Sequence, residues 1–229
     1  MKSTGQTIIL AALWVVTFAV ALACDRPVAE WVHRQGWDVH RSLPGGHRVL
    51  NFVLKVPGEY LFTLAVAVAV ALVLVHPGRW RAGIFVAIAG AVSGFNGVLK
   101  WVVGRHRPVV GIQPFKFQPF EGGVQGLFAA KDLCFPSGHA CLAFATAAAV
   151  GLVVPRWRYW LYTLAVFVGI ERVLENAHYV SDVVAAAAFG MLTAHLTWHV
   201  LHRLTRGSSE DRGNSQPHPT EGREVAVGP

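Results

Sequence analysis

Charged residues are scarce in this sequence. Only 14% of its 229 residues are Asp, Glu, Lys or Arg, whereas 53% are hydrophobic, and the mean hydropathy is +0.43. A soluble globule of this size needs more charged side chains to cover its surface. The composition therefore excludes an ordinary soluble domain and favours a chain embedded in a lipid bilayer.

Cysteine is also rare, with only Cys24, Cys134 and Cys141 in the chain. Their spacing matches no common metal-binding pattern, which argues against a zinc site built on thiolates. Cys141 falls inside an expected membrane span. We expect free thiols, and the alternative is a disulfide between Cys24 and Cys134 on the outer side of the membrane.

Apolar runs of membrane-spanning length fill most of the chain, given that a spanning helix needs roughly 20 residues. The fourth run is short, but Pro136 and Pro155 bound it, and its small residues suit burial among other helices. We expect an all-α polytopic membrane protein, with a six-transmembrane-helix bundle in residues 1–204 and a disordered cytoplasmic tail in residues 205–229. The expected spans are 6–24, 60–76, 82–103, 138–154, 157–175 and 183–204.

Basic residues indicate the orientation of these spans. Two very short connectors carry Arg79, Arg81, Arg156 and Arg158, and the positive-inside rule places such connectors, with both termini, in the cytoplasm. The longer connectors then face the outside, which for a bacterial inner membrane is the periplasm. Basic residues between the first two spans run against this orientation, although acidic residues accompany them: Arg26, Arg34, Arg41, Arg48 and Lys55, with Asp25, Glu30, Asp38 and Glu59.

The first apolar run admits two interpretations. A basic Lys2 followed by an apolar stretch that ends at Cys24 is similar to a secretory signal, but a lipoprotein cleavage site prefers Leu where Ala21 stands. We favour an uncleaved anchor. The next residues, 27–43, mix apolar and charged side chains at near-helical spacing, which suits a helix in the headgroup layer. A connector that packs on the bundle explains the same pattern.

A loop rich in Pro and Gly lies between Pro108 and Phe135. Exposing large aromatic side chains to water is costly, so we expect this loop to lie against lipid or over the mouth of the site. Its sequence contains Phe115, Phe117, Phe120 and Phe128.

Three short strings at the ends of hydrophobic segments indicate a phosphate site. Residues 100–108 read KWVVGRHRP, residues 136–139 read PSGH, and residues 172–182 hold Arg172, His178 and Asp182. The strings supply cations, a helix start whose free N–H groups favour an anion, and a His–Asp pair. They resemble the type 2 phosphatidic acid phosphatase family, whose pattern is K-x6-RP, then PSGH, then SR-x5-H-x3-D. One position departs, because Glu171 stands where the family has Ser.

Cations near a membrane surface commonly anchor headgroups, but the downstream strings favour phosphate binding here. Arg107 and Arg172 can each grip two phosphate oxygens, and Lys100 adds a point charge. Arg105 matches no fixed position of the family, and we expect it to be a headgroup or surface cation. The resemblance implies that the phosphate-binding residues are Lys100, Arg107, Ser137, Gly138 and Arg172.

The chemistry can be built from two histidines. His178 lies four residues before Asp182, whose carboxylate can accept a hydrogen bond from one ring nitrogen and leave the other aimed at phosphorus. Attack forms a phosphohistidine, while His139 protonates the departing alkoxide and later activates water. The resemblance implies the same roles: His178 is the nucleophile, Asp182 orients it and His139 is the general acid. We expect no metal and no cofactor, since cations and N–H groups already serve the phosphate.

A second histidine cluster lies on the last expected span. Spacings of four and three residues place its rings on one face, as metal ligation requires. The cluster falls at the expected cytoplasmic end, beside Trp198 and Arg203, without a nearby carboxylate. We favour contact with lipid headgroups over a metal site for His195, His199 and His202.

The sequence thus predicts metal-independent hydrolysis of a lipid phosphate or diphosphate monoester at the outer face of the membrane. The expected partners are the lipid substrate and membrane lipids, not nucleic acid, and the oligomeric state stays open. The family includes undecaprenyl-diphosphate, phosphatidylglycerophosphate and lipid A phosphatases, among which the carrier-lipid diphosphate is our first choice. The alternatives are transfer of phosphate to another lipid and a non-catalytic lipid-binding or transport protein.

Glu171 puts a carboxylate beside Arg172, in a site built to hold an anion. We expect it to pair with a cation, either Arg172 or Arg105, and to orient that cation. Glu175 lies one turn further on the same helical face and could share this role. The alternative is that Glu171 points away from the site.

Overall fold

A computed structural model describes residues 4–35, 83–89, 96–123 and 132–214. The named elements in these ranges are all helices, and the described residues contain no β-strand beyond two isolated bridges. In chain order the helices are α1 (Thr4–Gln35), α5 (Asn96–Val103), α7 (Gly138–Val153), the 3-10 turn η4 (Pro155–Trp157), α8 (Arg158–Leu174) and α9 (Val180–Asn214). The helical class predicted from the sequence is confirmed.

Two helices of the described part are long and apolar enough to cross a membrane. They are Ile8–Gln35 within α1 and Val180–Arg203 within α9, with mean hydropathies of 2.3 and 1.4. The expected spans 138–154 and 157–175 correspond to α7 and α8. Residues 83–89 and α5 represent the third expected span, and the second, 60–76, lies outside the described residues. The predicted number of six spans is therefore not tested.

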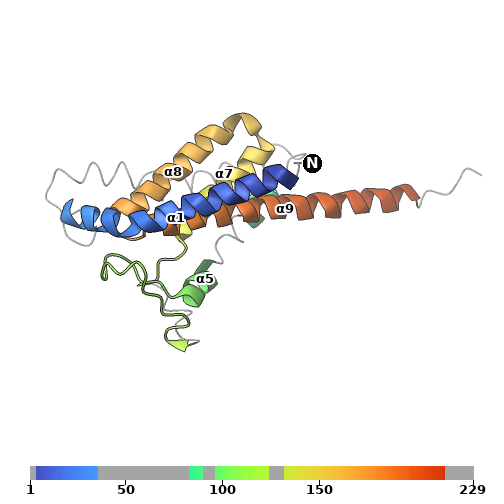
Figure 1. Cartoon of the computed structure of the whole chain (residues 1–229). Helices are drawn as coiled ribbons and strands as arrows, with labels where there is room; N and C mark the ends of the chain where they lie inside the picture. Colours follow the sequence, from blue (N-terminus) through green and yellow to red (C-terminus); the bar gives the residue numbers. More distant parts are fainter. Residues whose placement is uncertain (1–3, 36–82, 90–95, 124–131, 215–229) are drawn as a thin grey trace, which may run out of the picture.

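The core lies where α7 packs against both α8 and α9 (Figure 1). Small side chains dominate this contact, among them Ala140, Cys141, Ala147 and Ala186. Gly190 of α9 sits so close to α7 that a Cβ atom there would lie 2.3 Å from the Cys141 carbonyl oxygen. In lipid, close packing replaces the hydrophobic effect as the force between helices. The small residues thus bring the start of α7 and the start of α9 together.

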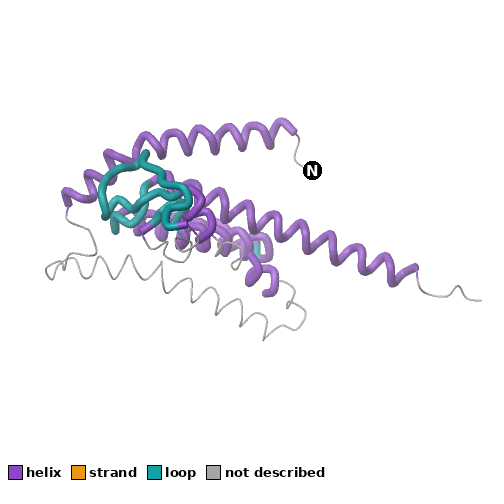
Figure 2. Tube along the Cα trace, turned by 90° about the horizontal axis from the view of Figure 1, so that it is seen from below, coloured by secondary structure: helices purple, strands orange, loops and turns teal. Residues whose placement is uncertain are grey.

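Helix α1 lies beside α9, and the two approach each other most closely where α1 ends and α9 begins (Figure 2). The sequence predicted a first span that ends at residue 24, which is too short, because α1 continues through Pro27 to Gln35. For residues 27–43 the sequence left open an interfacial helix and a connector, and the described part of that segment, residues 27–35, is a continuation of α1. The charge of Asp25 does not end the helix, since Asp25 is buried and paired. Residues 36–43 lie outside the described part.

At the other end of the chain, α9 continues to Asn214. The predicted disordered tail therefore begins too early, because residues 205–214 are helical. Extending an existing helix adds one hydrogen bond per residue without the cost of a new nucleus, which favours continuation beyond the apolar span. Residues 215–229 lie outside the described part.

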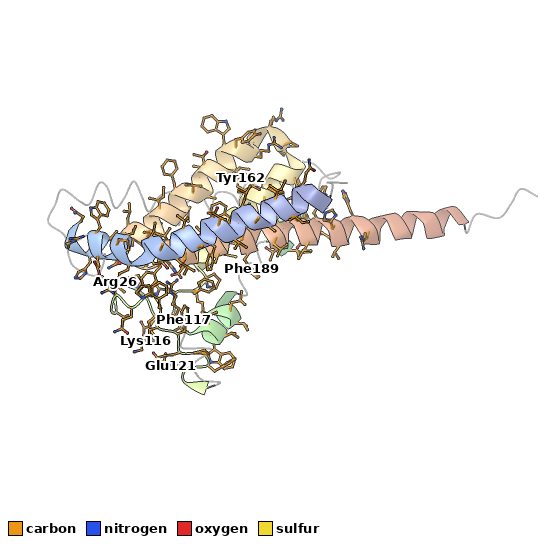
Figure 3. The ribbon with its side chains drawn as sticks, viewed as in Figure 1. Arg26, Lys116, Phe117, Glu121, Tyr162 and Phe189 are labelled. Atoms are coloured by element: carbon orange, nitrogen blue, oxygen red, sulfur yellow. The ribbon has the colours of Figure 1, made fainter. Side chains whose placement is uncertain are left out.

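A loop follows α5 and folds back beneath the helices. Gly104 begins it with φ +62°, and a Cβ atom there would lie 1.8 Å from the Gln118 carbonyl oxygen, so this position requires glycine. Phe117 and Lys116 lie beneath α1, near the end of that helix that carries Arg26 (Figure 3). The loop exposes 65% of Phe115, 45% of Phe117 and 52% of Phe120, whereas Phe128 is outside the described residues. Contact of this loop with lipid stays a prediction.

Candidate active site

The third sequence string forms the turn between α8 and α9. Arg172 lies in the last turn of α8, and its carbonyl oxygen accepts hydrogen bonds from the N–H groups of Ala177 and His178, both at 3.2 Å. Asn176 adopts φ +55°, a left-handed conformation that Asn tolerates better than most residues. This turn fixes the backbone of His178 directly before α9.

Asp182 stands at the third position of α9 and reaches back to the helix start. Its Oδ2 accepts a hydrogen bond of 2.8 Å from the N–H of Tyr179, the arrangement of a capping box. The same oxygen lies 3.7 Å from Nδ1 of His178, which is longer than a hydrogen bond. Catalytic hydrogen bonds are often long without substrate. Nε2 is then the ring nitrogen of His178 that is left for chemistry.

Burial is the largest influence on the imidazole of His178. It lowers the pKa of this ring below its ordinary value, and the opposing effect of Asp182 only partly offsets it. A lowered pKa keeps the imidazole neutral, so one ring nitrogen retains the lone pair that a nucleophile needs. The environment thus suits the predicted role of His178.

Helix α7 begins at the second string. Ser137 is its N-cap residue, although its side chain makes no capping bond, and Gly138 and His139 are the first helical residues. The N–H of Ser137 donates to the carbonyl oxygen of Asp182 at 3.2 Å, which ties the start of α7 to the start of α9. A helix start leaves several backbone N–H groups without intrahelical partners, and such groups favour an anion.

The structure brings the remaining predicted residues to the same place. Arg172, His178, Lys100 and Arg107 all lie close enough to interact electrostatically with the imidazole of His139. His139 is exposed, whereas His178 is 3% exposed. Residues from α5 and the loop after it, from α7 and from the α8–α9 turn therefore form one cluster, which combines three basic side chains with two histidines.

Several buried polar atoms in and near this cluster find no hydrogen-bond partner among the described residues. Such an atom costs roughly 1–3 kcal/mol, and native proteins keep few of them. Nε of Arg107 and Oγ of Ser137 are donors that the oxygens of a phosphate can satisfy, whereas Nδ1 of His178 is the nitrogen that faces Asp182. The atoms are Nε of Arg107, Oγ of Ser137, Nδ1 of His178 and both side-chain amide atoms of Asn176.

Glu171 is buried and paired with Arg172. Its Oε1 accepts a hydrogen bond of 2.6 Å from Nη2, and its Oε2 accepts one of 3.1 Å from Nε. Oε2 of Glu175 lies 2.7 Å from the same Nη2. The predicted pairing of Glu171 with a cation is confirmed, with Arg172 rather than Arg105 as the partner, and Glu175 shares the contact as expected.

Arg105 is fully buried, so its prediction as a headgroup or surface cation is wrong. Its guanidinium contacts Asp25, Ser181, Asp182 and the Pro114 carbonyl oxygen. Paired carboxylates compensate the burial of its charge, and the sequence pattern did not place them beside it. A signal was present, because an acidic residue at the end of an apolar run needs a partner when it lies at membrane depth.

The sequence also singled out the three cysteines and the histidine cluster of α9. Cys24, Cys134 and Cys141 are free thiols, so the alternative of a Cys24–Cys134 disulfide is excluded. On α9 the His202 ring packs edge-on against Trp198, with 4.2 Å between ring centroids. The part of the chain that the structure describes contains no group of three His, Cys, Asp or Glu side chains able to hold a metal.

The chain is similar to several known proteins. Residues 80–206 match the sequence model of the PAP2 superfamily. The chain is 40% identical over 95 residues to a lipid A 1-phosphatase of Rhizobium etli. This match covers 41% of this chain and 38% of that protein. It is 39% identical over 108 residues to a lipid A 1-phosphatase of Rhizobium johnstonii, or 46% of this chain and 42% of that protein. The matches thus span about two fifths of the length of these relatives.

A solved structure has a similar fold. It is the crystal structure of a transmembrane PAP2-type phosphatidylglycerolphosphate phosphatase from Bacillus subtilis, with a TM-score of 0.54 and 19% sequence identity. The similarity covers 84% of this chain and 96% of that one. At this level of identity the likeness concerns the fold, which is that of a transmembrane protein.

Proposed function

Because this chain belongs to the PAP2 superfamily, we propose that it hydrolyses a phosphate ester of a membrane lipid, with the cluster around His139 and His178 as its active site. The observation that carries this proposal is the convergence of the two histidines with Lys100, Arg107 and Arg172. Cations and the N–H groups at the start of α7 provide the charge that a phosphoryl group requires in its transition state.

In the first step, the lone pair on Nε2 of His178 forms a bond to phosphorus. The bond between phosphorus and the lipid oxygen breaks, and its electron pair stays on that oxygen, which takes a proton from the imidazolium form of His139. Asp182 faces the other ring nitrogen and stabilises the positive charge that the phosphohistidine ring carries. The lipid then leaves as an alcohol, or as a lipid monophosphate when the substrate is a diphosphate.

In the second step, the now neutral His139 takes a proton from water as the water oxygen attacks phosphorus. The bond between phosphorus and Nε2 breaks, and its electron pair returns to His178 as phosphate departs. His139 is exposed, as a residue that must meet both the leaving lipid and water has to be. The basic side chains stay charged in both steps and only hold the phosphoryl oxygens.

The curated relatives direct the choice of substrate. The sequence alone favoured a carrier-lipid diphosphate, but the two relatives from Rhizobium are named lipid A 1-phosphatases. We therefore place lipid A 1-phosphate first, ahead of carrier-lipid diphosphate and phosphatidylglycerophosphate. These compounds share a phosphate on a lipid at the membrane surface, which the cluster at the helix ends would meet.

The setting that we propose is a bundle of six spans in the inner membrane of a bacterium. The active site faces the periplasm and both termini face the cytoplasm. Support comes from the apolar helices α1 and α9 and from the short basic connector around Arg156 and Arg158. Cysteine-scanning accessibility at Arg156 and at Gly111 tests it, because the two positions should label from opposite sides of the membrane.

The experiment that tests the function is phosphate release by the purified full chain from a panel of lipid phosphates. The panel contains lipid A 1-phosphate, undecaprenyl diphosphate, phosphatidylglycerophosphate and phosphatidic acid, and EDTA is present throughout. We expect turnover of at least one lipid and no turnover by His178→Ala. Loss of substrate without free phosphate but with a newly phosphorylated lipid would identify a phosphotransferase. Binding without turnover would leave a lipid-binding protein and overturn the proposal.

A further inference from the structure

Asp25 connects α1 to the start of α9. It is 0% exposed, although it lies 21 residues into an apolar helix that begins at Thr4. Its Oδ1 accepts a hydrogen bond of 2.9 Å from the N–H of Ser181, and its Oδ2 accepts one of 2.5 Å from the Ser181 hydroxyl. A carboxylate at a helix N-terminus is stabilised by the free N–H groups there.

Arg105 bridges Asp25 to Asp182. Its Nη2 lies 2.6 Å from Oδ2 of Asp25, and its Nη1 donates to Oδ1 of Asp182 and, at 2.7 Å, to the hydroxyl of Ser181. The third edge of the guanidinium is used as well, because Nε donates to the Pro114 carbonyl oxygen at 2.9 Å. All three nitrogens of this guanidinium thus donate to groups of the chain, and it is not arranged to bind phosphate.

The ring of Tyr179 covers the guanidinium face, with its centroid 4.2 Å from Cζ of Arg105. The N–H of the same residue holds Oδ2 of Asp182, while Arg105 holds Oδ1. Both oxygens of the carboxylate are therefore fixed, and Oδ2 is the one that faces His178. Asp182 is held by Arg105 from the loop after α5 and by Tyr179 directly before α9, and α1 acts on it through the contact of Asp25 with Arg105.

We propose that Asp25 and Arg105 are positioning residues for the reaction, because they hold Asp182 in the orientation from which it fixes the imidazole of His178. Neither touches the substrate. The inference rests on the proposed function only through the role of His178. It assigns a part to α1, which lies outside the matched residues 80–206.

The charges of this network form a balance that can be tested. Two carboxylates and one guanidinium, all fully buried, leave a net charge of −1 next to His178. Arg105→Gln changes that charge to −2, which drives one carboxylate to take up a proton and so removes the anion that orients the ring. The double variant Asp25→Asn/Arg105→Gln restores −1. Arg105→Lys keeps the charge but loses the planar fork.

The experiment measures kcat, KM and the inhibition constant of inorganic phosphate for these variants. Residues that orient a catalytic group typically change activity by about 10- to 100-fold, so we expect kcat to fall about 100-fold in Arg105→Gln and about 10-fold in Asp25→Asn. KM and the phosphate inhibition constant should stay within about threefold, because the phosphate site keeps its own cations. Arg105→Lys and the double variant should each retain more activity than Arg105→Gln.

The control is Glu30→Gln on the same helix. Glu30 forms an exposed ion pair with Arg26 at 2.9 Å, so this variant removes a carboxylate of α1 without touching the network. It should match the wild type in kcat. Wild-type kcat in Arg105→Gln would overturn the inference. A parallel loss of kcat and phosphate affinity in Arg105→Gln, with no gain in the double variant, would also overturn it. The network would then only stabilise the fold.

A spectroscopic measurement separates this inference from the proposed function. In ¹⁵N spectra of histidine-labelled protein, with the His178 signals assigned from His178→Ala, we expect the wild type to carry its proton on Nδ1. Arg105→Gln and Asp25→Asn should show a mixture of the two ring tautomers. If no lipid on the panel is hydrolysed, the proposed function fails. The spectra still test whether Asp25 and Arg105 orient the imidazole of His178. An unchanged Nδ1–H tautomer in both variants would contradict the positioning role.

Discussion

Glu171 forms two hydrogen bonds with the guanidinium of Arg172, the next residue in the chain, from a position that is only 1% exposed. The pair places a buried negative charge beside a cation that the proposed mechanism assigns to phosphate. Arg172 also contacts Glu175, so two carboxylates hold its fork. The position of this cation is thus fixed at the expense of some of its attraction for an anion.

Replacing Glu171 should therefore strengthen phosphate binding. Removing one like charge from the neighbourhood of an anion is worth on the order of 1 kcal/mol, or roughly fivefold in affinity. We expect Glu171→Ser and Glu171→Gln to lower the inhibition constant of inorganic phosphate by about that factor while activity is kept. Glu30→Gln on α1 serves as the control. A large loss of activity in both folded variants would mean that the carboxylate takes a direct part in the reaction.

His139→Ala should reveal its role through the leaving group. General acid catalysis typically contributes about 10²- to 10⁴-fold, and it matters least when the leaving group is a weak base. Turnover by His139→Ala should fall steeply for an alkyl phosphate and much less for an aryl phosphate with an acidic phenol. His202→Ala is the matched control, because His202 lies about 30 Å along α9 from Asp182 and the active site. Equal losses across the leaving-group series would remove the general-acid assignment.

Chelation should leave activity unchanged. Lys100, Arg107 and Arg172 carry the positive charge that a metal would otherwise supply to the phosphoryl oxygens. We expect the same rate of phosphate release in buffer and in EDTA, and we expect inhibition by vanadate, which can accept the ring nitrogen of His178. A rate that disappears in EDTA and returns with one divalent ion would shift the mechanism to metal catalysis.

Gly190→Ala should destabilise the fold. The added Cβ would lie 2.3 Å from the Cys141 carbonyl oxygen and 2.9 Å from the backbone nitrogen of Ala145, and backbone atoms cannot move aside easily. Overpacking of this kind costs about 1–3 kcal/mol, so the unfolding temperature in detergent should fall by several degrees. Gly97→Ala is the control, because its Cβ would meet nothing within 4 Å. Equal unfolding temperatures in the two variants would contradict the close α7–α9 contact.

Sequence patterns predicted the helices α7 and α8 well because proline residues and apolar runs mark their ends. Ser137 stands at the start of α7 as the PSGH string indicated. Asp182 lies near His178, but the predicted hydrogen bond between them is not formed, since Oδ2 and Nδ1 are 3.7 Å apart. Helix ends without such marks were predicted less well. Pro27 reads as a stop in sequence, yet α1 passes through it, and proline is tolerated more often inside membrane-spanning helices than inside helices of soluble proteins.

The network of Asp25, Arg105 and Ser181 could not be predicted in the same way. Its members are 80 and 76 residues apart in the chain, and no spacing rule joins them. Arg105 stands only two residues before Arg107 in the chain. The turn at Gly104 and the fold of the loop direct Arg105 inward to Asp182 and Arg107 to the phosphate cluster. The identity of a cation in sequence does not say which anion it meets.

The central claim is that His178 forms a covalent bond to the phosphoryl group of a lipid. The most direct measurement incubates the purified chain with a ³²P-labelled lipid phosphate, stops the reaction in alkali, where phosphohistidine survives, and maps the label. We predict label on the peptide that contains His178, none in His178→Ala, and more in His139→Ala with a good leaving group, because breakdown also needs His139. Full turnover by a wild type that never carries label, or label that persists in His178→Ala, would contradict the account.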